Sequence, residues 1–584
     1  MGEAEAFYFR YWGKAKPCAE GGQPYHLLVY HSLDVAAVAS VWWDQSLPIQ
    51  DSFIQHAAGL SREQMKAWVI FFIALHDYGK FDIRFQRKAP EAWTLLQNNF
   101  VGSDELPTPH DCKTYDHGSA GIYWYINDYS EDVEQDLGED WLLQIETLVE
   151  DKPDDLWLAW IKSVAGHHGY VYPPKTNPDE FKCKLSLCVS SEIKTQDQIA
   201  RQQWFKELER IFLQPVGLSL EDKPPIPSPL LAGFCSVADW LGSRSDEVNF
   251  RYKADPVDDL GSDYFGQRCL EDAPRVLALS GINGTTKTFN GVSALLQGYK
   301  PRQLQTLVDQ LPADPGLTIV EAPTGSGKTE MALAYAWRLI TENHADSIVF
   351  AMPTQATANA MMPRLEKLAT TLFEDHPNLI LAHGHARFNA DFLTLKETWK
   401  TAQGKDEAWV HCSEWLGQSR KRIFLGQIGV CTIDQVLVSV LPVKHRFVRG
   451  FGVGRSVLIV DEVHAYDAYM YGLLEAVLRD QYNAGGSSLL LSATLNKQLR
   501  GDLLATYGEP IESETDSLPY PLISWSNKKT VCSYTLPEEE LPPERQVKIE
   551  CSLNDDLLPD ESLQERIIAA AEQGAQVAII CNLV

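Results

Sequence analysis

The stretch EAPTGSGKTE, Glu321–Glu330, decides the fold class of the region around it. It follows the apolar run Leu317–Val320 and leads into the helix-forming run Met331–Ile340, so the local order is strand, glycine turn, helix. In that order the glycines let backbone N–H groups converge on phosphate oxygens at the positive end of a helix. The pattern G-x-G-K-T therefore predicts a phosphate-binding loop, and a chance glycine-rich turn that carries a lysine is the alternative.

The residues of this loop have separate expected roles. Lys328 is expected to reach the β- and γ-phosphates of a nucleotide, and the Thr329 hydroxyl to ligate Mg²⁺. The predicted nucleotide-binding residues of the loop are Thr324, Gly325, Ser326, Gly327, Lys328, Thr329 and Glu330.

Short apolar runs alternate with helical segments after the loop, which is typical of a parallel sheet with helices on both faces. The expected strands are Ser347–Met352, Leu379–Ala382, Ile428–Thr432, Val457–Val460 and Ser488–Leu491. The fourth of these runs directly into Asp461 and Glu462. At the carboxyl edge of such a sheet, where ligands bind, Asp461 is expected to hold the Mg²⁺ of ATP and Glu462 to orient or deprotonate the attacking water.

The first 250 residues have a different pattern, because apolar residues recur at helical spacing and β-branched runs are scarce. The expected helices are His26–Trp43, Arg62–Asp77, His117–Asp128, Leu156–Ala165, Gln198–Phe212 and Pro229–Leu241. The expected fold is therefore multidomain, with an all-α domain followed by an α/β parallel-sheet domain.

Several His and Asp residues lie on or beside these helices where a plain apolar core has no use for them. They are His31, His76, Asp77, His117, His167, His168 and Asp239. An unpaired buried carboxylate is costly, so such a set must be paired or bound to something. Imidazoles with a few carboxylates suit Fe, Mn, Co, Ni or Zn better than Ca²⁺, and a carboxylate shared by two ions is the arrangement used for phosphodiester hydrolysis. Each residue alone also fits an ordinary core or surface position.

Composition and charge limit the partners and the compartment. The 584 residues suggest several domains, and 51 Lys+Arg against 79 Asp+Glu give a net charge of −28, which argues against a broad cationic surface. One basic cluster is either a strand- or partner-binding face or a solvated loop: Lys444, His445, Arg446, Arg449 and Arg455. Near the N-terminus no run has the length of a membrane span or the layout of a signal peptide, so a cytoplasmic protein without a membrane partner is expected.

The order His, His-Asp, His, His-His, Asp on successive helices resembles the HD superfamily of metal-dependent phosphohydrolases. The resemblance implies one ion held by His31, His76, Asp77 and Asp239. It implies a second ion that shares Asp77 and adds His117, His167 and His168. His76 and Asp77 would then be catalytic. Lys80, in HDYGKFD, is a candidate contact to the scissile phosphate, and a solvated helix-end lysine is the alternative.

The α/β part is similar to superfamily 2 helicases. In those proteins a glutamine ahead of the first strand reads adenine, so Gln305 is a candidate adenine contact with Arg302 as a helper. Ser492-Ala493-Thr494 is the motif that there couples ATP hydrolysis to nucleic acid. Further candidate contacts to a strand backbone are Pro353, Thr354, Gln355, Asn359, the turn His383-Gly384, Thr432, Asp434 and Gln435.

An HD domain ahead of a superfamily 2 helicase core resembles the CRISPR-associated helicase–nucleases of type I interference systems. The motifs HDYGKFD, GHHG, EAPTGSGKTE, DEVHAYD and LLSATL are most similar to subtype I-E members, and the resemblance runs from Tyr11 to Val584. It implies recruitment to a Cascade-type RNA-guided surveillance complex after R-loop formation and nicking of the displaced single-stranded DNA. It also implies ATP-driven 3′→5′ translocation that feeds the strand to the nuclease. A monomer is expected.

The expected domain boundaries follow from these parts. They are an HD-type nuclease domain at 1–254, a connector at 255–298, a first RecA-like domain at 299–510, a linker at 511–545 and the start of a second RecA-like domain at 546–584. In the last part, strands are expected at Val547–Cys551 and Ala575–Val584 and a helix at Leu563–Gln573. The remaining strands and arginine motifs of a second RecA-like domain are not in this sequence, so a truncated domain and slow or absent ATP turnover are expected.

Two other functions remain open from the sequence. HD-type domains also hydrolyse nucleotides, although the fused strand-binding motor argues against that substrate. A non-catalytic DNA-binding or recruitment module, with a structural and metal-free helical half, is the second alternative, and metal content distinguishes it.

Overall fold

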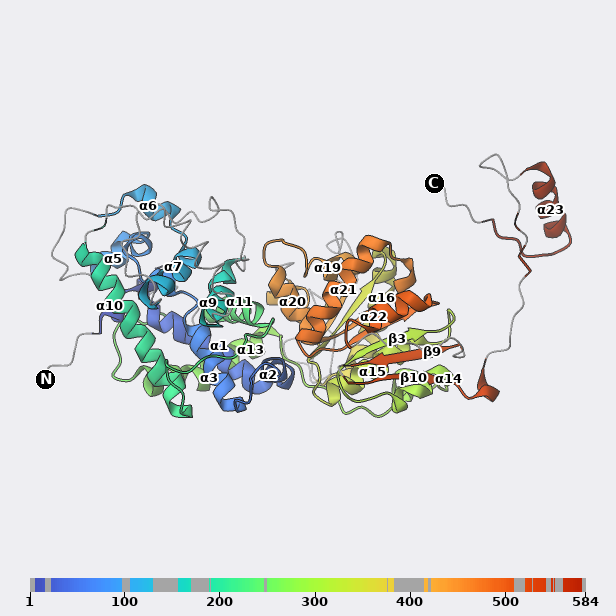
Figure 1. Cartoon of the computed structure of the whole chain (residues 1–584), viewed down its shortest axis with the longest axis horizontal. Helices are drawn as coiled ribbons and strands as arrows, with labels where there is room; N and C mark the ends of the chain where they lie inside the picture. Colours follow the sequence, from blue (N-terminus) through green and yellow to red (C-terminus); the bar gives the residue numbers. More distant parts are fainter. Residues whose placement is uncertain are drawn as a thin grey trace. The chain divides into compact units, whose positions relative to one another are not determined.

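The computed structural model describes residues 6–15, 23–96, 106–129, 156–169, 189, 191–245, 249–374, 377–382, 414–417, 422–508, 520–527, 529–541, 548–549, 551 and 560–579. The chain forms two compact units, Met1–Leu536 and Pro537–Val584. The first unit contains a helical half and a half built on a mostly parallel sheet (Figure 1), which confirms the predicted fold class.

The helical half has a core of long helices joined by short ones. Their bounds are α1 Leu28–Gln45, α2 Leu47–Ile54, α3 Arg62–Ala74, α4 Ile83–Gln86, α5 Pro90–Leu96, α6 Pro109–Thr114, α7 His117–Tyr129, α9 Leu156–Ala165, α10 Ser191–Leu208 and α11 Leu231–Gly242. Two short antiparallel strands, β1 Trp12–Lys14 and β2 His26–Leu27, precede α1. Helix α1 is buried around most of its circumference, because α3 and α11 both pack against it.

One helix ends earlier than predicted, just before His76 and Asp77. The run expected to be helical to Asp77 leaves the α-helix after Ala74 and forms a turn and the short 3₁₀ helix Tyr78–Lys80. The reason is the close approach of this turn to the start of α7, where a Cβ on Gly79 would lie 2.0 Å from the carbonyl oxygen of His117. His76 and Asp77 therefore lie in a turn.

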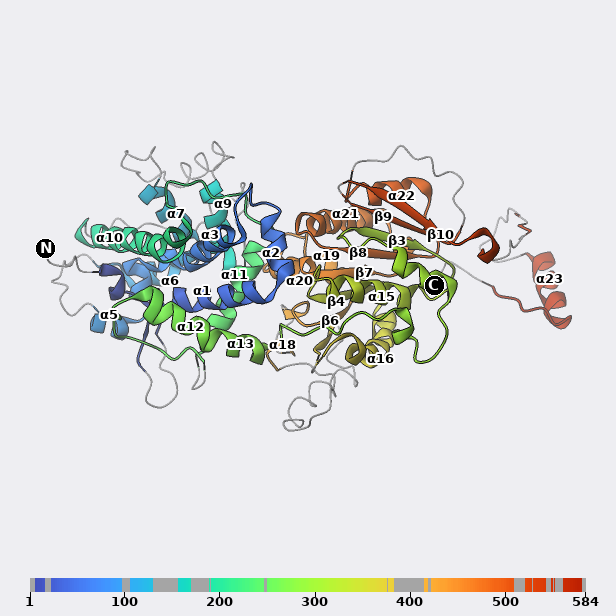
Figure 2. The ribbon, with the colours of Figure 1, turned by 90° about the horizontal axis from the view of Figure 1, so that it is seen from below.

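The second half contains an eight-stranded sheet of order β10-β9-β3-β8-β7-β4-β6-β5. The strands are β3 Leu317–Glu321, β4 Ser347–Met352, β5 Leu379–Ala382, β6 Ile428–Thr432, β7 Ser456–Val460, β8 Ser488–Ser492, β9 Leu522–Ser526 and β10 Val531–Thr535. Strands β3 to β8 are parallel and fully buried, as expected for a sheet covered by helices on both faces (Figure 2). Their carboxyl ends share one edge.

The helices of this half follow the strands that they cover. Their bounds are α14 Gln303–Thr306, α15 Lys328–Thr341, α16 Gln355–Leu372, α18 Glu414–Gly417, α19 Ile433–Leu437, α20 Arg446–Gly454, α21 Ala468–Asn483 and α22 Lys497–Leu504. Side-chain caps fix several helix starts, among them Thr354 at α16 and Asp467 at α21.

The linker predicted at 511–545 is wrong for two segments. Leu522–Ser526 and Val531–Thr535 form antiparallel strands that extend the sheet, and the first of them pairs along the whole length of β3. The Pro- and acid-rich composition around them hid this pairing. Without β9, the backbone N–H and C=O groups on that side of β3 would have no strand partner. Pairing with β9 gives them hydrogen-bond partners, so β9 belongs to the sheet.

The connector predicted at 255–298 is divided between the two halves. It contains α12 Gln267–Leu270 and α13 Asp272–Ser280, which pack on α1 of the helical half. Further along, Thr286 forms a bridge to Phe373, at the end of α16 in the sheet half.

The second unit, Pro537–Val584, contains helix α23 Glu561–Glu572, close to the predicted helix. The strand predicted at Ala575–Val584 is wrong for its described part, because residues 575–579 are exposed and pair with no other described segment. Of Val547–Cys551, only 548, 549 and 551 are described, and they are not in a strand. A strand is stable only with a neighbour that satisfies its backbone, and these segments have none among the described residues.

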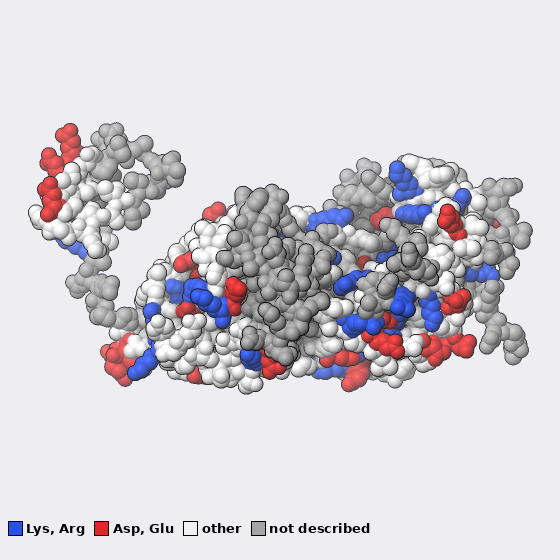
Figure 3. All heavy atoms as spheres, turned by 180° about the vertical axis from the view of Figure 1, so that it is seen from behind, with Lys and Arg blue, Asp and Glu red and all other residues white. Residues whose placement is uncertain are grey.

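The two halves of the first unit contact each other through α11 and α20. The predicted basic surface cluster is wrong for two of its residues, which are buried. Arg455 is fully buried, with its guanidinium 3.5 Å from Asp346, and His445 is also buried. The face in Figure 3 shows both acidic and basic side chains on the described surface. Among the described helices, none has the length and apolar content to cross a membrane.

Candidate metal centre and nucleotide site

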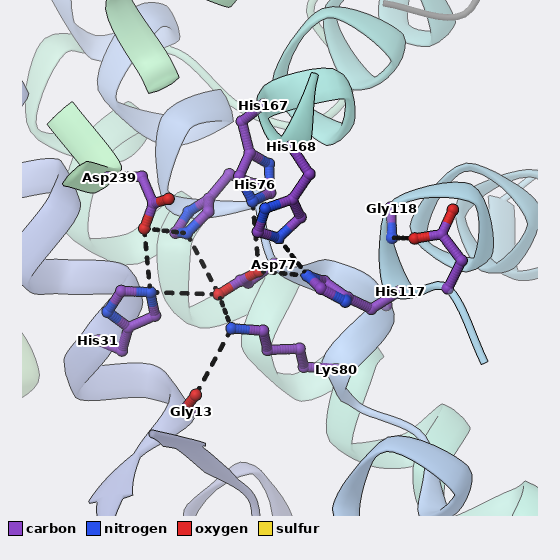
Figure 4. A network of polar contacts seen from close by, with 12 residues as sticks. Gly13, His31, His76, Asp77, Lys80, His117, Gly118, His167, His168 and Asp239 are labelled. Carbon is purple, nitrogen blue, oxygen red and sulfur yellow. Dashed lines mark hydrogen bonds and ion pairs between the residues drawn. The ribbon is translucent and has the colours of Figure 1, made fainter. Parts of the chain in front are cut away.

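Five separate elements bring the predicted His and Asp residues to one place in the helical half (Figure 4). His31 comes from α1, and His76 and Asp77 come from the turn after α3. The other four are His117 at the start of α7, His167 and His168 on the 3₁₀ helix Gly166–His168, and Asp239 on α11. All seven residues that the sequence singled out therefore converge.

The carboxylate of Asp77 lies in the middle of the cluster. Its Oδ2 is 3.2 Å from His31 Nε2 and 3.3 Å from His76 Nε2. Its Oδ1 faces the other way, 3.4 Å from His117 Nε2 and 3.7 Å from His167 Nε2. The two oxygens of one carboxylate thus face two different groups of ligands.

Asp239 and His168 complete the two groups. Asp239 Oδ1 is 3.5 Å from His31 Nε2 and 3.9 Å from His76 Nε2, and His168 Nε2 is 2.6 Å from His117 Nε2. The set formed by His31, His76 and Asp239 and the set formed by Asp77, His117, His167 and His168 each have ligand atoms within 4.8 Å of one another.

The hydrogen bonds of the ring nitrogens fit metal binding. His76 Nδ1 lies 2.9 Å from the carbonyl oxygen of Ile73, and His167 Nδ1 lies 2.8 Å from that of Val164. A ring whose Nδ1 donates to a carbonyl presents an unprotonated Nε2, as a metal ligand does. Within the described part of the chain, His31 Nε2, His76 Nε2 and both Asp77 oxygens are buried without a hydrogen-bond partner. Such groups are costly unless an ion satisfies them.

The electrostatics keep the ligands in metal-binding form. Burial lowers the pKa of His117 to about 4 and that of His167 to about 3, so these rings are neutral at pH 7. Burial alone would raise the pKa of Asp77, but the Lys80 ammonium and His76 hold that pKa well below its usual range. Neutral imidazoles and ionised carboxylates are the states that coordinate metal ions. The donor set therefore fits two transition-metal ions that share Asp77.

Lys80 is buried beside the cluster and is not a solvated helix end. Its Nζ is 2.5 Å from Asp77 Oδ2 and 3.5 Å from the carbonyl oxygen of Gly13. Burial lowers the pKa of Lys80, and the charge of Asp77 opposes that effect. The Gly13 backbone was not predicted to belong to the site, and no signal marks it, since it lies more than sixty residues before the HDYGKFD motif in a two-strand ribbon.

The phosphate loop lies at the carboxyl end of β3, and its glycines have the expected backbone. Gly325 has φ +78° and Gly327 has φ +90°, which is the left-handed region that favours glycine. Lys328 Nζ donates to the carbonyl oxygen of Ala322 at 2.6 Å. Burial lowers the pKa of Lys328, although Glu462 and Asp461 oppose this.

A cavity of about 580 Å³ opens beside this loop. Among the residues that line it are the predicted Arg302, Gln305, Thr324, Gly325, Gly327, Lys328, Thr329, Glu330, Asp461 and Glu462. Ser326 belongs to the loop but not to the lining. Gln305 Nε2 donates to the Gly327 carbonyl oxygen at 3.3 Å, which joins the predicted adenine contact directly to the loop.

Tyr299, Arg364 and Lys367 are among the lining residues that the sequence reasoning missed. Tyr299 is strongly exposed within YKPRQLQ, and Arg364 and Lys367 are on α16, far from any nucleotide motif. The aromatic residue Tyr299, close in sequence to Arg302 and Gln305, could have been predicted to line the nucleotide site. No sequence signal marks Arg364 and Lys367, because only the packing of α16 brings these two side chains to the cavity.

Asp461 and Glu462 follow β7 directly, and the backbone there is unusual. Glu462 has φ +54°, and its N–H donates to Asp461 Oδ1 at 2.9 Å. Burial and then the charge of Glu462 raise the pKa of Asp461. His464 contacts both motifs, since its Nε2 is 3.4 Å from Glu462 Oε2 and its Nδ1 is 3.1 Å from Ser492 Oγ.

The predicted strand-contacting residues lie at the carboxyl edge of neighbouring strands. Pro353, Thr354 and Gln355 follow β4. In its neighbour β6, Thr432 is the last residue, and Asp434 and Gln435 come just after it. Ser492 is the last residue of β8 and Thr494 comes two residues later, and the Ser492 hydroxyl donates to the Thr494 carbonyl oxygen at 3.0 Å. Thr354, Gln355, Asp434 and Thr494 are exposed. His383 and Gly384 lie outside the described residues.

Comparison with known proteins agrees with this two-part arrangement. The family described as "Cas3, HD domain" matches residues 12–248, and the family described as "DEAD/DEAH box helicase" matches residues 301–501. The CRISPR-associated endonuclease/helicase Cas3 of Escherichia coli (strain K12) is 51% identical over 579 residues, which are 98% of this chain and 64% of the relative. The protein of the same name from Thermus thermophilus is 32% identical, over 91% of this chain and 54% of the relative.

Solved structures give the same picture. The crystal structure of T. fusca Cas3-AMPPNP has a TM-score of 0.69 and 25% identity, covering 97% of this chain and 60% of that one. A chain in a pre-nicking CRISPR RNA-guided surveillance complex shares the fold with a TM-score of 0.59 and 22% identity, covering 97% and 59%. The chain thus spans somewhat less than two thirds of the length of these relatives. With its HD domain followed by a DEAD/DEAH box helicase domain, the chain belongs to the Cas3 family.

Proposed function

We propose that the protein is a metal-dependent nuclease for single-stranded DNA, coupled to an ATP-dependent 3′→5′ helicase or translocase. The observation that carries the nuclease part is the Asp77 carboxylate, whose two oxygens face two separate groups of imidazole ligands. A shared carboxylate between two ions is the arrangement by which two-metal enzymes hydrolyse phosphodiesters.

The residues that would hold the ions fall into the two groups already described. His31, His76 and Asp239 would join Asp77 at one ion, and His117, His167 and His168 would join Asp77 at the other. This donor set of imidazole nitrogens and carboxylate oxygens favours Fe, Mn, Co or Ni. Two such ions, when bound, lower the pKa of a bound water and stabilise charge on the phosphoryl oxygens.

Lys80 is proposed to act on the substrate. Its ammonium is buried next to Asp77 and held by the Gly13 carbonyl, so its position is fixed before a strand arrives. A fixed cation near the scissile phosphate stabilises the charge that develops in the transition state without further rearrangement.

ATP is the proposed ligand of the cavity beside the phosphate loop. Lys328 would contact the β- and γ-phosphates, Thr329 and Asp461 would hold Mg²⁺, and Glu462 would orient the attacking water. The similarity to T. fusca Cas3-AMPPNP supports this assignment. The exposed residues at the ends of β4, β6 and β8 are the proposed contacts to the strand backbone, and Ser492 and Thr494 are proposed to couple them to ATP hydrolysis.

The biological role follows from the relatives. We infer that the protein degrades invading DNA after recruitment by an RNA-guided Cascade-type surveillance complex, in the cytoplasm and as a monomer. The presence of a chain with the same fold in a CRISPR RNA-guided surveillance complex supports the kind of partner. A nucleotide phosphohydrolase is disfavoured, because the helicase domain at residues 301–501 would have no role in it.

The test is cleavage of circular single-stranded DNA with Mn²⁺ or Ni²⁺, compared with a chelator. We expect metal-dependent cleavage, two ions per chain by elemental analysis, and loss of cleavage with retained strand binding in His76→Ala and Asp77→Ala. Hydrolysis of dNTPs with the DNA left intact would identify a nucleotide phosphohydrolase instead. No metal and no cleavage would identify a recruitment module.

A further inference from the structure

A glutamine that the metal centre does not include connects three parts of that site. Gln86 ends helix α4 and is 1% exposed. Its Oε1 accepts from the Trp12 N–H at 2.9 Å, and its Nε2 donates to the carbonyl oxygens of Trp12 at 3.1 Å and Lys80 at 2.9 Å. In return, the indole Nε1 of Trp12 donates to the Gln86 carbonyl oxygen at 2.9 Å. The carboxamide thus holds both backbone groups of Trp12 and, at the same time, the backbone of Lys80.

The strand fixed by Gln86 forms one side of the metal centre. Gly13, next to Trp12, accepts a hydrogen bond from Lys80 Nζ at 3.5 Å. The same residue lies so close to α1 that an added Cβ would be 2.9 Å from the Cβ of His31 and 3.0 Å from the Cα of Leu28. The peptide of Gly13 is therefore held between a metal ligand and the catalytic lysine (Figure 4).

Lys80 is held at both of its ends by this arrangement. Its main-chain carbonyl is bound by the Gln86 carboxamide, and its ammonium lies between Asp77 Oδ2 and the Gly13 carbonyl oxygen. Its side chain also passes the ring of Phe85, 5.2 Å from the ammonium, and that ring packs on Trp12 with centroids 4.9 Å apart. A lysine has four rotatable bonds, and the entropy of ordering them opposes a fixed position, so a fixed position requires contacts of this kind.

We propose that Gln86 is a positioning residue of the nuclease, which fixes β1 so that the Gly13 carbonyl directs the Lys80 ammonium toward the scissile phosphate. This rests on the proposed nuclease function. The hydrogen bonds described for the Gln86 side chain reach Trp12 and the Lys80 backbone and none of the seven candidate metal ligands, so its expected effect on cleavage runs through Lys80. A displacement of a catalytic group by about 1 Å lowers a reaction rate by about 100-fold.

The test replaces the carboxamide with an apolar side chain of similar length in the full chain, Gln86→Met. We expect the single-turnover rate of single-strand cleavage at saturating DNA to fall 10- to 100-fold, with Mn²⁺ affinity within twofold of the native value. Gln203→Met is the matched control. It removes a similar tether, the 2.8 Å hydrogen bond from the Phe7 N–H to Gln203 Oε1, away from the metal centre, and we expect native cleavage.

A double-mutant cycle separates positioning from general loss of stability, because it measures whether two residues act through each other. In a Lys80→Ala background, Gln86→Met is expected to change the remaining cleavage rate less than twofold. Equal effects of Gln86→Met with and without Lys80 would overturn the proposal, and so would native cleavage by the single variant. The native chain in the same assay distinguishes failure of the Gln86 proposal from failure of the proposed nuclease function. Absence of metal-dependent cleavage by the native chain would overturn the nuclease function itself.

Discussion

At the scale of single residues, the helical half contains a buried titratable carboxyl group beyond the candidate metal ligands. Asp197 is buried. Its carboxyl group accepts one hydrogen bond from the Tyr11 hydroxyl at 2.6 Å and another from the Ile83 N–H at 3.0 Å. Burial, followed by the charge of nearby Asp82, raises the pKa of Asp197 to about 7. This network lies beside HDYGKFD and holds the segment that follows the His76–Asp77 turn.

The raised pKa of Asp197 predicts a pH dependence of stability. An unfolded Asp has a pKa of about 3.9, so between pH of about 4 and 7 the native state binds a proton that the unfolded state lacks. The stabilisation is complete below pH of about 4 and is lost as the pH rises through about 7, with a slope of at most about 1.4 kcal/mol per pH unit. Asp197→Asn removes this titration.

Urea unfolding of the metal-free chain at pH 5 and pH 8 measures the effect. The free energy of unfolding of Asp197→Asn relative to the native chain is expected to increase from pH 5 to pH 8 by about 1–3 kcal/mol. Parallel pH profiles for the two proteins would show that Asp197 is ionised in the native state at both pH values.

At the scale of elements, helix α20 of the sheet half packs on the helices that carry metal ligands. Phe451 of α20 contacts Trp42 of α1, with ring centroids 5.3 Å apart, and Phe234 of α11, at 5.9 Å. Just before α20, the His445 N–H donates to the Gly169 carbonyl oxygen at 2.8 Å, next to His168. The predicted basic cluster is thus largely a contact between the halves.

The close approach of α11 and α20 predicts opposite effects for two glycine-to-alanine changes. A Cβ on Gly233 would lie 2.3 Å from the Phe451 Cβ and 2.6 Å from the Phe447 carbonyl oxygen, whereas a Cβ on Gly450 meets nothing within 4 Å. Overpacking costs about 1–3 kcal/mol, so Gly233→Ala is expected to lower stability. Gly450→Ala is expected to raise it by about 0.5–1 kcal/mol through helix propensity alone.

Thermal unfolding of the two variants and the native chain checks this pair. If Gly233→Ala were as stable as Gly450→Ala, α11 and α20 would not be in close contact in solution.

At the scale of the whole molecule, the two halves hold separate candidate sites. The metal ligands are all in the helical half, and the phosphate loop, Asp461 and Glu462 are all at the carboxyl edge of the sheet. Among the described residues no side chain belongs to both sites. The proposed nicking of a free single strand is therefore expected to need no residue of the nucleotide site.

Lys328→Ala tests this separation. The variant is expected to lose nucleotide binding and to nick single-stranded DNA at a rate within about twofold of the native chain, because the hydrogen bonds of Lys328 Nζ lie within the phosphate loop. Equilibrium binding of a fluorescent ATP analogue and a metal-dependent nicking assay measure the two activities. Loss of nicking in Lys328→Ala would mean that the two centres are not independent.

The sequence by itself determined the fold class and the β3-to-β8 strands, and it singled out, through the resemblance to HD-type enzymes, the seven His and Asp residues that converge. The first two depend on local signals, namely glycines before a lysine and short apolar runs, and the third depends on the order of His and Asp residues along successive helices. Tertiary structure alone decided that Asp77 presents one oxygen to each ligand group, that β9 and β10 join the sheet, and that Arg455 is buried. It also decided that Gln86, Trp12 and Gly13 belong around Lys80. These are contacts between residues distant in the chain, and no local pattern encodes the packing that brings them together.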